Sequence, residues 1–117
     1  MKENSSLSER FGKCPYATVQ SLIAGKWAIL ILKYLGDGPL RFNELLRKMP
    51  KMTNATLSVQ LKSLEENGII NRVQHETIPP KVEYSLTEIG EQFRPVIAAM
   101  ETWGKAYIAE MNEKAKQ

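Results

Sequence analysis

The sequence has a single cysteine and a single histidine among its 117 residues, and it has no glycine-rich phosphate loop. One cysteine cannot form an internal disulfide, which favours a reducing compartment. Cys14 and His75 lie far apart in the sequence, so they indicate neither a zinc site nor a nucleophile paired with a base. We therefore expect no metal, no cofactor and no enzymatic activity.

Long hydrophobic runs are also missing. The longest uncharged stretch, Cys14 to Gly25, contains polar residues, and the apolar run at 27–32 is bracketed by lysines. A membrane-spanning helix needs about 20 apolar residues. The first ten residues are polar and lack the apolar segment of a secretory signal. These absences predict a cytoplasmic protein that makes no contact with a membrane.

The chain also lacks a large net charge. The chain has 16 Lys and Arg residues against 13 Asp and Glu, a net charge of +3. This excess permits nucleic acid as a partner without requiring it. Hydrophobic residues make up 43%, which excludes a disordered chain, and the length is that of one domain. We predict a flexible polar arm over 1–13 and a single domain over 14–117.

Local patterns divide this domain into helices and one hairpin. Apolar residues at helical spacing predict helices, and strict alternation predicts strands. The expected elements are a short helix from Pro15 that Gly25 ends, helices over 26–35, 42–49 and 53–67, strands over 69–76 and 82–86, and a helical tail after Thr87. Pro95 must kink this tail or begin a new helix. The helix over 26–35 is apolar nearly all round, which predicts burial in the middle of the core.

The central elements follow the order of a winged helix-turn-helix domain. The helix over 42–49, a turn at 50–52 and the helix over 53–67 have helix-turn-helix spacing, and the hairpin follows where such domains carry a wing. We predict a mainly α-helical fold with a small β-hairpin wing. Its parts are a helix-turn-helix over about 41–67, a wing over about 69–86 and C-terminal dimerisation helices over about 87–114.

The helix over 53–67 has a core face and an unusual opposite face. Leu57, Leu61 and Leu64 fall within a narrow arc and must face the core. Opposite them stand Ala55 and Val59, which suit thymine methyl groups, and a lysine that suits phosphate. The polar start of this helix and two cations of the wing complete the prediction. The residues predicted to contact DNA are Thr53, Asn54, Ala55, Thr56, Val59, Gln60, Lys62, Arg72 and Lys81.

An ordinary solvated helix face is the alternative interpretation of this pattern. The helix before it and the hairpin after it favour DNA contact. For Lys81, a solvated lysine beside a proline turn fits the spacing as well as a contact with a phosphate or a minor groove does. His75 has no feature of a ligand or a base.

Five segments carry a resemblance to a known family: Cys14-Pro15, Gly25-Lys26-Trp27, GPLRFNEL at 38–45, LEENGII at 64–70 and PPKVEYSLT at 79–87. They resemble the signature of HxlR-type regulators, which are winged-helix transcription factors related to the MarR group. The similarity runs from about residue 11 to residue 108, which is nearly the whole chain. Ala55 and Gln60 stand where such proteins often have a basic residue, which leaves the operator sequence open.

The resemblance implies a homodimeric DNA-binding regulator whose first and last helices form the dimer interface. The residues agree, because one small domain cannot easily cover an apolar stripe so far past its wing, and a partner chain can. The predicted interface residues are Tyr16, Val19, Met100, Trp103, Tyr107, Ile108 and Met111. Two-fold symmetry then predicts an inverted-repeat operator with half-sites one or more helical turns apart.

Cys14 is the candidate for a redox sensor. In one branch of the family that the chain resembles, an N-terminal cysteine at this position senses oxidants or electrophiles. Lys13 and the start of the next helix favour its thiolate. A disulfide would have to join Cys14 to the partner's Cys14, and a mixed disulfide or electrophile adduct would need no partner. The alternative is a small hydrophobic residue packed at the dimer interface.

Two other functions remain open at this point. One is a winged helix that binds a protein instead of DNA, for which Glu65 and Glu66 are the relevant acidic residues. The other is a repressor controlled by a small molecule, with Trp27, Trp103 and Tyr107 as pocket residues, although no convergent polar group defines a ligand. The sequence leaves the effector and the sign of regulation undetermined.

Overall fold

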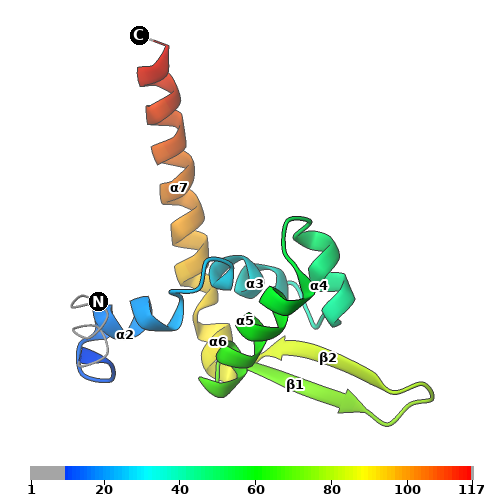
Figure 1. Cartoon of the computed structure of the whole chain (residues 1–117). Helices are drawn as coiled ribbons and strands as arrows, with labels where there is room; N and C mark the ends of the chain where they lie inside the picture. Colours follow the sequence, from blue (N-terminus) through cyan, green and yellow to red (C-terminus); the bar gives the residue numbers. More distant parts are fainter. Residues whose placement is uncertain (1–9, 117) are drawn as a thin grey trace.

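The computed structural model describes residues 10–116, and its elements follow the predicted order (Figure 1). Residues 1–9 of the predicted polar arm lie outside the described residues, and residues 11–13 form a turn in which Lys13 and Cys14 donate to the carbonyl of Arg10. The elements are α2 (Pro15–Leu22), α3 (Ala28–Leu35), α4 (Phe42–Lys48), α5 (Asn54–Glu66), β1 (Ile70–His75), β2 (Lys81–Leu86), α6 (Glu88–Gln92) and α7 (Arg94–Ala115).

The core lies where α3, α4 and α5 meet the root of the wing. Its fully buried side chains come from these elements: Ile31, Leu32, Leu35, Leu45, Leu57, Leu61, Leu64 and Ile70. The prediction that the helix over 26–35 is buried on all sides is wrong for two residues. Ile29 and Leu30 are each 36% exposed in the single chain, because α3 packs against the core along one side only.

The wing is an antiparallel hairpin that is joined to the helix-turn-helix by a third short segment. Ile70 pairs with Leu86 at the root, and His75 pairs with Lys81 near the tip. Leu40, just before α4, forms an isolated bridge with Tyr84 through two backbone hydrogen bonds of 3.0 and 2.8 Å. The sequence pattern gave no sign of this bridge, because a single residue has no alternation to detect.

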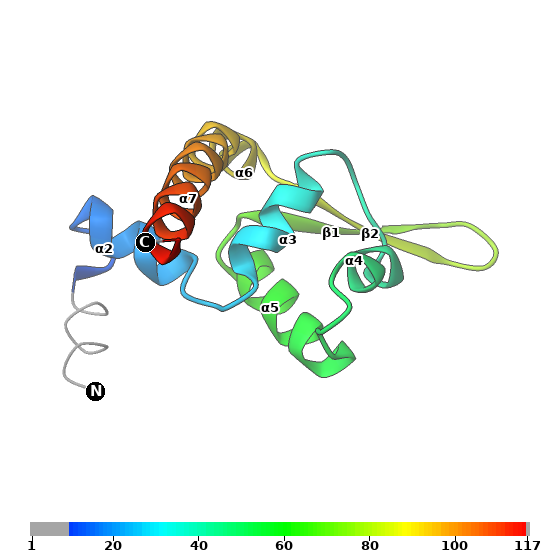
Figure 2. The same cartoon turned by 90° about the horizontal axis from the view of Figure 1, so that it is seen from above.

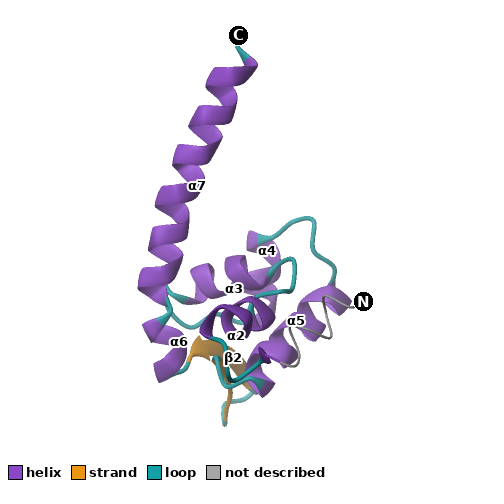
Figure 3. Ribbon diagram, turned by 90° about the vertical axis from the view of Figure 1, so that its left-hand side faces the viewer, coloured by secondary structure: helices purple, strands orange, loops and turns teal. Residues whose placement is uncertain are grey.

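Pro95 begins a new helix and does not kink a continuous one. The side chain of Thr87 caps α6 by accepting a hydrogen bond from the backbone N–H of Gly90. Phe93 separates α6 from α7, and Pro95 stands in the first turn of α7, where a missing N–H costs nothing. No residue of α7 is buried, and the helix extends away from the rest of the domain (Figures 1 and 3).

The helices at the two ends of the chain lie on one side of the molecule. Figures 1 and 2 show α2 and α7 on one side of the core, with α4 and the wing on the other. In the part of the chain that the structure describes, no helix is both long and apolar enough to cross a membrane.

Residue 90 has to be a glycine because the backbone of α6 lies close to the backbone of Ile69 at this point. A Cβ atom at this position would overlap the carbonyl oxygen of Ile69, which belongs to the backbone and cannot move aside. We therefore expect Gly90→Ala to lower the free energy of unfolding by about 2 kcal/mol, in the range of overpacked cores. Urea denaturation followed by circular dichroism measures this change. The neighbouring exposed substitution Glu88→Ala is the control, with an expected change within about 0.5 kcal/mol; equal effects of the two would contradict the packing argument.

Candidate nucleic-acid interface

The second helix of the helix-turn-helix, α5, is held with one face inward and the other outward. Leu57, Leu61 and Leu64 are buried in the core, and Thr53 caps the start of the helix because its Oγ1 accepts a hydrogen bond of 3.1 Å from the N–H of Thr56. The outward face carries Val59, which is 66% exposed. Ala55, one turn before Val59, is exposed as well, so the two side chains can together make an apolar contact with a partner.

Most of the predicted DNA-contact residues of α5 are accessible on this outward face or at its start. Five of them are exposed: Thr53, Asn54, Ala55, Val59 and Lys62. Thr56 is half-buried, and its hydroxyl accepts a hydrogen bond of 2.9 Å from that of Thr53. The Thr53 hydroxyl is thus occupied by the cap, whereas the hydroxyl hydrogen of Thr56 can be donated elsewhere.

Gln60 differs from the other predicted residues of α5. It is half-buried, and its side-chain amide lies against Gly25, where a Cβ atom would overlap it. Gln60 therefore packs against the loop before α3. It also gives a physical reason for the glycine in the Gly25-Lys26-Trp27 segment, because any larger residue would displace the amide.

The wing places its two predicted cations in different surroundings. Arg72 is exposed in the middle of β1, opposite Tyr84. Lys81 is half-buried at the start of β2, and its Nζ atom lies 3.5 Å from Oε2 of Glu83. The other carboxylate oxygen of Glu83 lies 2.8 Å from Nε2 of His75. The histidine therefore has an acidic partner across the hairpin that its position in the sequence did not reveal.

Glu83 is the titratable group of the wing with a shifted pKa. Partial burial by itself would raise the pKa of this carboxyl group, but the hydrogen bond with His75 and the charge of Lys81 outweigh it. The pKa of Glu83 is lowered from its ordinary value of 4.5 as a result. Glu83 is therefore an anion at neutral pH, and it offsets the positive charge at this end of the wing.

The predicted dimer-interface residues are solvent-accessible in the single chain. Tyr16 on α2 is 86% exposed and Trp103 on α7 is 68% exposed. The rings of Trp103 and Tyr107 stack with centroids 5.3 Å apart and an angle of 18° between their planes. Val19 and Ile108 are also exposed, whereas Met100 and Met111 are half-buried. These apolar side chains lie on the two helices that share one side of the molecule.

Cys14 stands directly before α2 and is half-buried. Its carbonyl oxygen accepts hydrogen bonds from the backbone N–H and the hydroxyl of Thr18, at 2.9 and 2.8 Å. The same hydroxyl accepts a hydrogen bond from the N–H of Gly12. The turn before α2 is thereby tied to the first turn of the helix, with the thiol at the junction.

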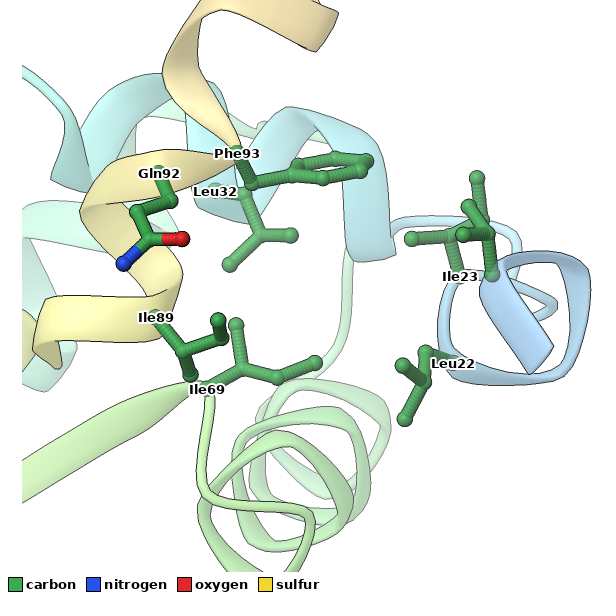
Figure 4. Close-up of a pocket in the computed structure, with 8 residues that line it drawn as sticks. Leu22, Ile23, Leu32, Ile69, Ile89, Gln92 and Phe93 are labelled. Carbon is green, nitrogen blue, oxygen red and sulfur yellow. The ribbon is translucent and has the colours of Figure 1, made fainter. Parts of the chain in front are cut away.

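An apolar cavity of about 290 Å³ lies between α2, α3 and α6. Figure 4 shows Leu22 and Ile23 on one side of it, across from Leu32, Ile69, Ile89 and Phe93. The aromatic residues predicted for an effector pocket, Trp27, Trp103 and Tyr107, are not among its lining residues. Its lining includes one polar side chain, the amide of Gln92.

Comparison with known proteins identifies the family. The sequence pattern described as the HxlR-like helix-turn-helix family matches residues 22–112. The chain belongs to the HxlR-like helix-turn-helix family. The HTH-type transcriptional regulator YdeP of Bacillus subtilis is 46% identical over 100 residues, which are 86% of this chain and 78% of YdeP.

Solved structures of the redox regulator HypR and of a MarR-family regulator share the fold. The redox regulator HypR matches in its oxidized form with 41% identity and a TM-score of 0.75, over 80% of this chain and 96% of HypR. The reduced form of HypR matches with 37% identity and a TM-score of 0.80, over 86% of this chain and 99% of HypR. A MarR-family regulator from Porphyromonas gingivalis W83 matches with 35% identity and a TM-score of 0.75, over 80% of this chain and 92% of that regulator.

These findings confirm the predicted winged helix-turn-helix fold and the predicted class. The members of the family and the similar structures are transcriptional regulators and not enzymes. This HxlR-like chain is accordingly a transcriptional regulator with a helix-turn-helix fold.

Proposed function

We propose that this HxlR-like chain is a sequence-specific DNA-binding regulator that acts as a homodimer on an inverted-repeat operator. The outward face of α5 is the observation that supports this most directly. It combines exposed small apolar side chains, Ala55 and Val59, with the basic Lys62, and the polar Asn54 is exposed at the start of the same helix. Such a face can contact thymine methyl groups and base edges in a major groove and phosphates at its rim.

The wing contributes contacts beside this groove. Arg72 is exposed on β1 and Lys81 stands near the tip, so both can approach the DNA backbone or a minor groove. Because the partner is the DNA of the cell, we expect the protein to act in the cytoplasm. An operator that overlaps a promoter would give repression, and one that favours polymerase contacts would give activation.

The dimer is supported by the apolar side chains that the single chain leaves uncovered. A 22-residue helix without a buried residue, carrying an exposed Trp103–Tyr107 stack, is a costly surface for a monomer. A second copy can cover it together with Tyr16 and Val19 of α2. Two-fold symmetry then sets two α5 helices at a fixed spacing, which an inverted repeat matches.

Cys14 is proposed as the thiol through which oxidants alter DNA binding. HypR, a redox regulator, was solved in an oxidized and a reduced form, and both resemble this chain. Two Cys14 thiols of a dimer can form one disulfide, giving up two electrons and two protons to an oxidant such as a peroxide. Alternatively, one thiol can attack a small disulfide, forming a mixed disulfide and releasing the other half as a thiol.

DNA binding is tested by fluorescence anisotropy with a duplex from upstream of the protein's own gene and a random duplex of equal length. We expect tighter binding to the upstream duplex, with both affinities falling as salt rises. Lys62→Ala should weaken binding roughly tenfold at low salt and reduce the salt slope by about one, because it removes one phosphate contact. Lys105→Ala, on α7, is the control and should change neither. Absence of binding to any duplex would favour the protein-binding alternative.

The dimer is tested by sedimentation equilibrium. We expect twice the monomer mass of 13.3 kDa for the wild-type chain. Replacing Trp103 and Tyr107 together by Asp should give a folded monomer, because two carboxylates cannot be buried unpaired. Lys105 lies on the face of α7 opposite Trp103 and Tyr107, so the Lys105→Ala variant is the control and should stay dimeric. A monomeric wild-type protein at micromolar concentration would contradict the proposal.

The thiol is tested by repeating the anisotropy titration after treatment with hydrogen peroxide or a small disulfide. We expect the affinity for the upstream duplex to change in the wild type and to be restored by a reductant. Cys14→Ser should bind with wild-type affinity and should not respond. Non-reducing electrophoresis and intact mass distinguish a Cys14–Cys14 disulfide from a mixed disulfide. An equal response in Cys14→Ser would contradict a sensor role.

A further inference from the structure

A polar hollow of about 510 Å³ separates α4 from the wing. Its walls carry three cations, Arg41, Arg47 and Lys81, together with two carboxylates, Glu44 and Glu83. The cations come from two elements that are far apart in the sequence and are brought together by the bridge between Leu40 and Tyr84. A hollow that gathers cations from separate elements has the chemistry of an anion site.

The two carboxylates of this hollow have partners of their own. Oε1 of Glu44 accepts a hydrogen bond of 2.8 Å from the backbone N–H of Arg41, which caps the start of α4. Glu83 is engaged by His75 and Lys81. Among the residues that the structure describes, neither Arg41 nor Arg47 has a carboxylate oxygen within ion-pair distance. The two guanidinium groups therefore retain their charge and their hydrogen-bond donors for an external anion.

Lys81 is held less firmly by its acidic partner than His75 is. Its Nζ atom lies 3.5 Å from Oε2 of Glu83, which is beyond ordinary hydrogen-bond length, whereas His75 lies 2.8 Å from Oε1. The side chains of Lys81 and Glu83 are 36% and 21% exposed, so water and salt still screen part of this long ion pair. A phosphate that enters the hollow can therefore compete with Glu83 for Lys81.

The position of the hollow points to DNA as the source of the anion. It lies between the first helix of the helix-turn-helix and the wing, on the side of the molecule away from α2 and α7 (Figures 1 and 2). A duplex that receives α5 in its major groove has a phosphate strand on each rim of that groove. The three cations of the hollow, with two carboxylates beside them, have the chemistry to bind a phosphate of such a strand.

We propose that this hollow binds a backbone phosphate of DNA through Arg41, Arg47 and Lys81, and that Glu83 limits the affinity by competing for Lys81. The proposal rests on the proposed DNA-binding function and adds a positively charged site outside the predicted contact residues of α5. Glu83 acts through Lys81, so it is a positioning residue. The contact carries no base information, so it changes the affinity for every sequence by the same factor.

The arginines are tested in the full-length chain by anisotropy against the upstream and random duplexes over a series of salt concentrations. We expect Arg41→Ala and Arg47→Ala each to weaken binding to both duplexes by an equal factor, about five- to tenfold at low salt. Each should lower the salt slope by about 0.9, the value for one phosphate. Arg10→Ala, on the far side of the molecule, should change neither. Arg47→Gln replaces Arg47→Ala if circular dichroism shows that the alanine variant is unfolded.

Glu83 is tested by a double-mutant cycle with Lys81. We expect Glu83→Gln to tighten binding to both duplexes several-fold at low salt, with a steeper salt slope, because one negative charge is removed from the phosphate path. Lys81→Ala should cost more affinity in the Glu83→Gln background than in the wild type. Glu101→Gln is the matched control, because Glu101 forms a similar pair with Lys105, at 3.6 Å, on α7; it should leave the affinity unchanged.

The outcomes separate the site from the function as a whole. If the wild type binds DNA and the Arg41, Arg47 and Glu83 variants bind equally well, the phosphate site is wrong and the DNA-binding function stands. If Arg47→Ala weakens only the upstream duplex, the arginine reads bases and the proposal is overturned. If the wild type binds no duplex at all, the proposed function itself fails.

Discussion

Burial of one side of α5 is the constraint on which the rest of the structure depends. Leu57, Leu61 and Leu64 are at most 1% exposed, and each buried leucine contributes about 2 kcal/mol that a rotation of the helix would lose. This burial determines which residues point outward, so Val59 is exposed without any interaction of its own to hold it there. The outward face of α5 is thus set by residues that never contact a partner.

The wing is tied to the helical part of the domain at its root and again partway along β2. At the root, the hydroxyl of Thr87 donates to the carbonyls of Gly68 and Ile69, at 2.7 and 3.0 Å, and so joins the end of α5 to the start of α6. Along β2, the two backbone hydrogen bonds between Leu40 and Tyr84 join the wing to α4. These hydrogen bonds join α5, α4 and the wing, and the bridge at Leu40 brings α4 beside β2, where the hollow lies.

Local signals were sufficient to predict the elements, but not the contacts between them. Capping residues such as Thr53 and Thr87, and Gly68 with its positive φ of 74° after α5, act within one turn of the chain and are visible in a single sequence. The contact of Gln60 with Gly25 and the pairing of Glu83 with His75 depend on how distant segments pack. Helical periodicity placed Gln60 beside the outward face, and only the loop before α3 decides which way its amide turns.

The single chain separates two kinds of surface on opposite sides of its core. On one side, α2 and α7 expose Tyr16, Trp103 and other apolar side chains, whereas Arg41, Arg47 and Lys81 line the hollow beside the wing on the other. Cys14 belongs to the first side, at the start of α2. Under the proposed function, oxidation of this thiol therefore affects DNA binding by changing how the two subunits are arranged. Oxidation would then alter the spacing of the two α5 helices, and with it their fit to the two half-sites of the operator.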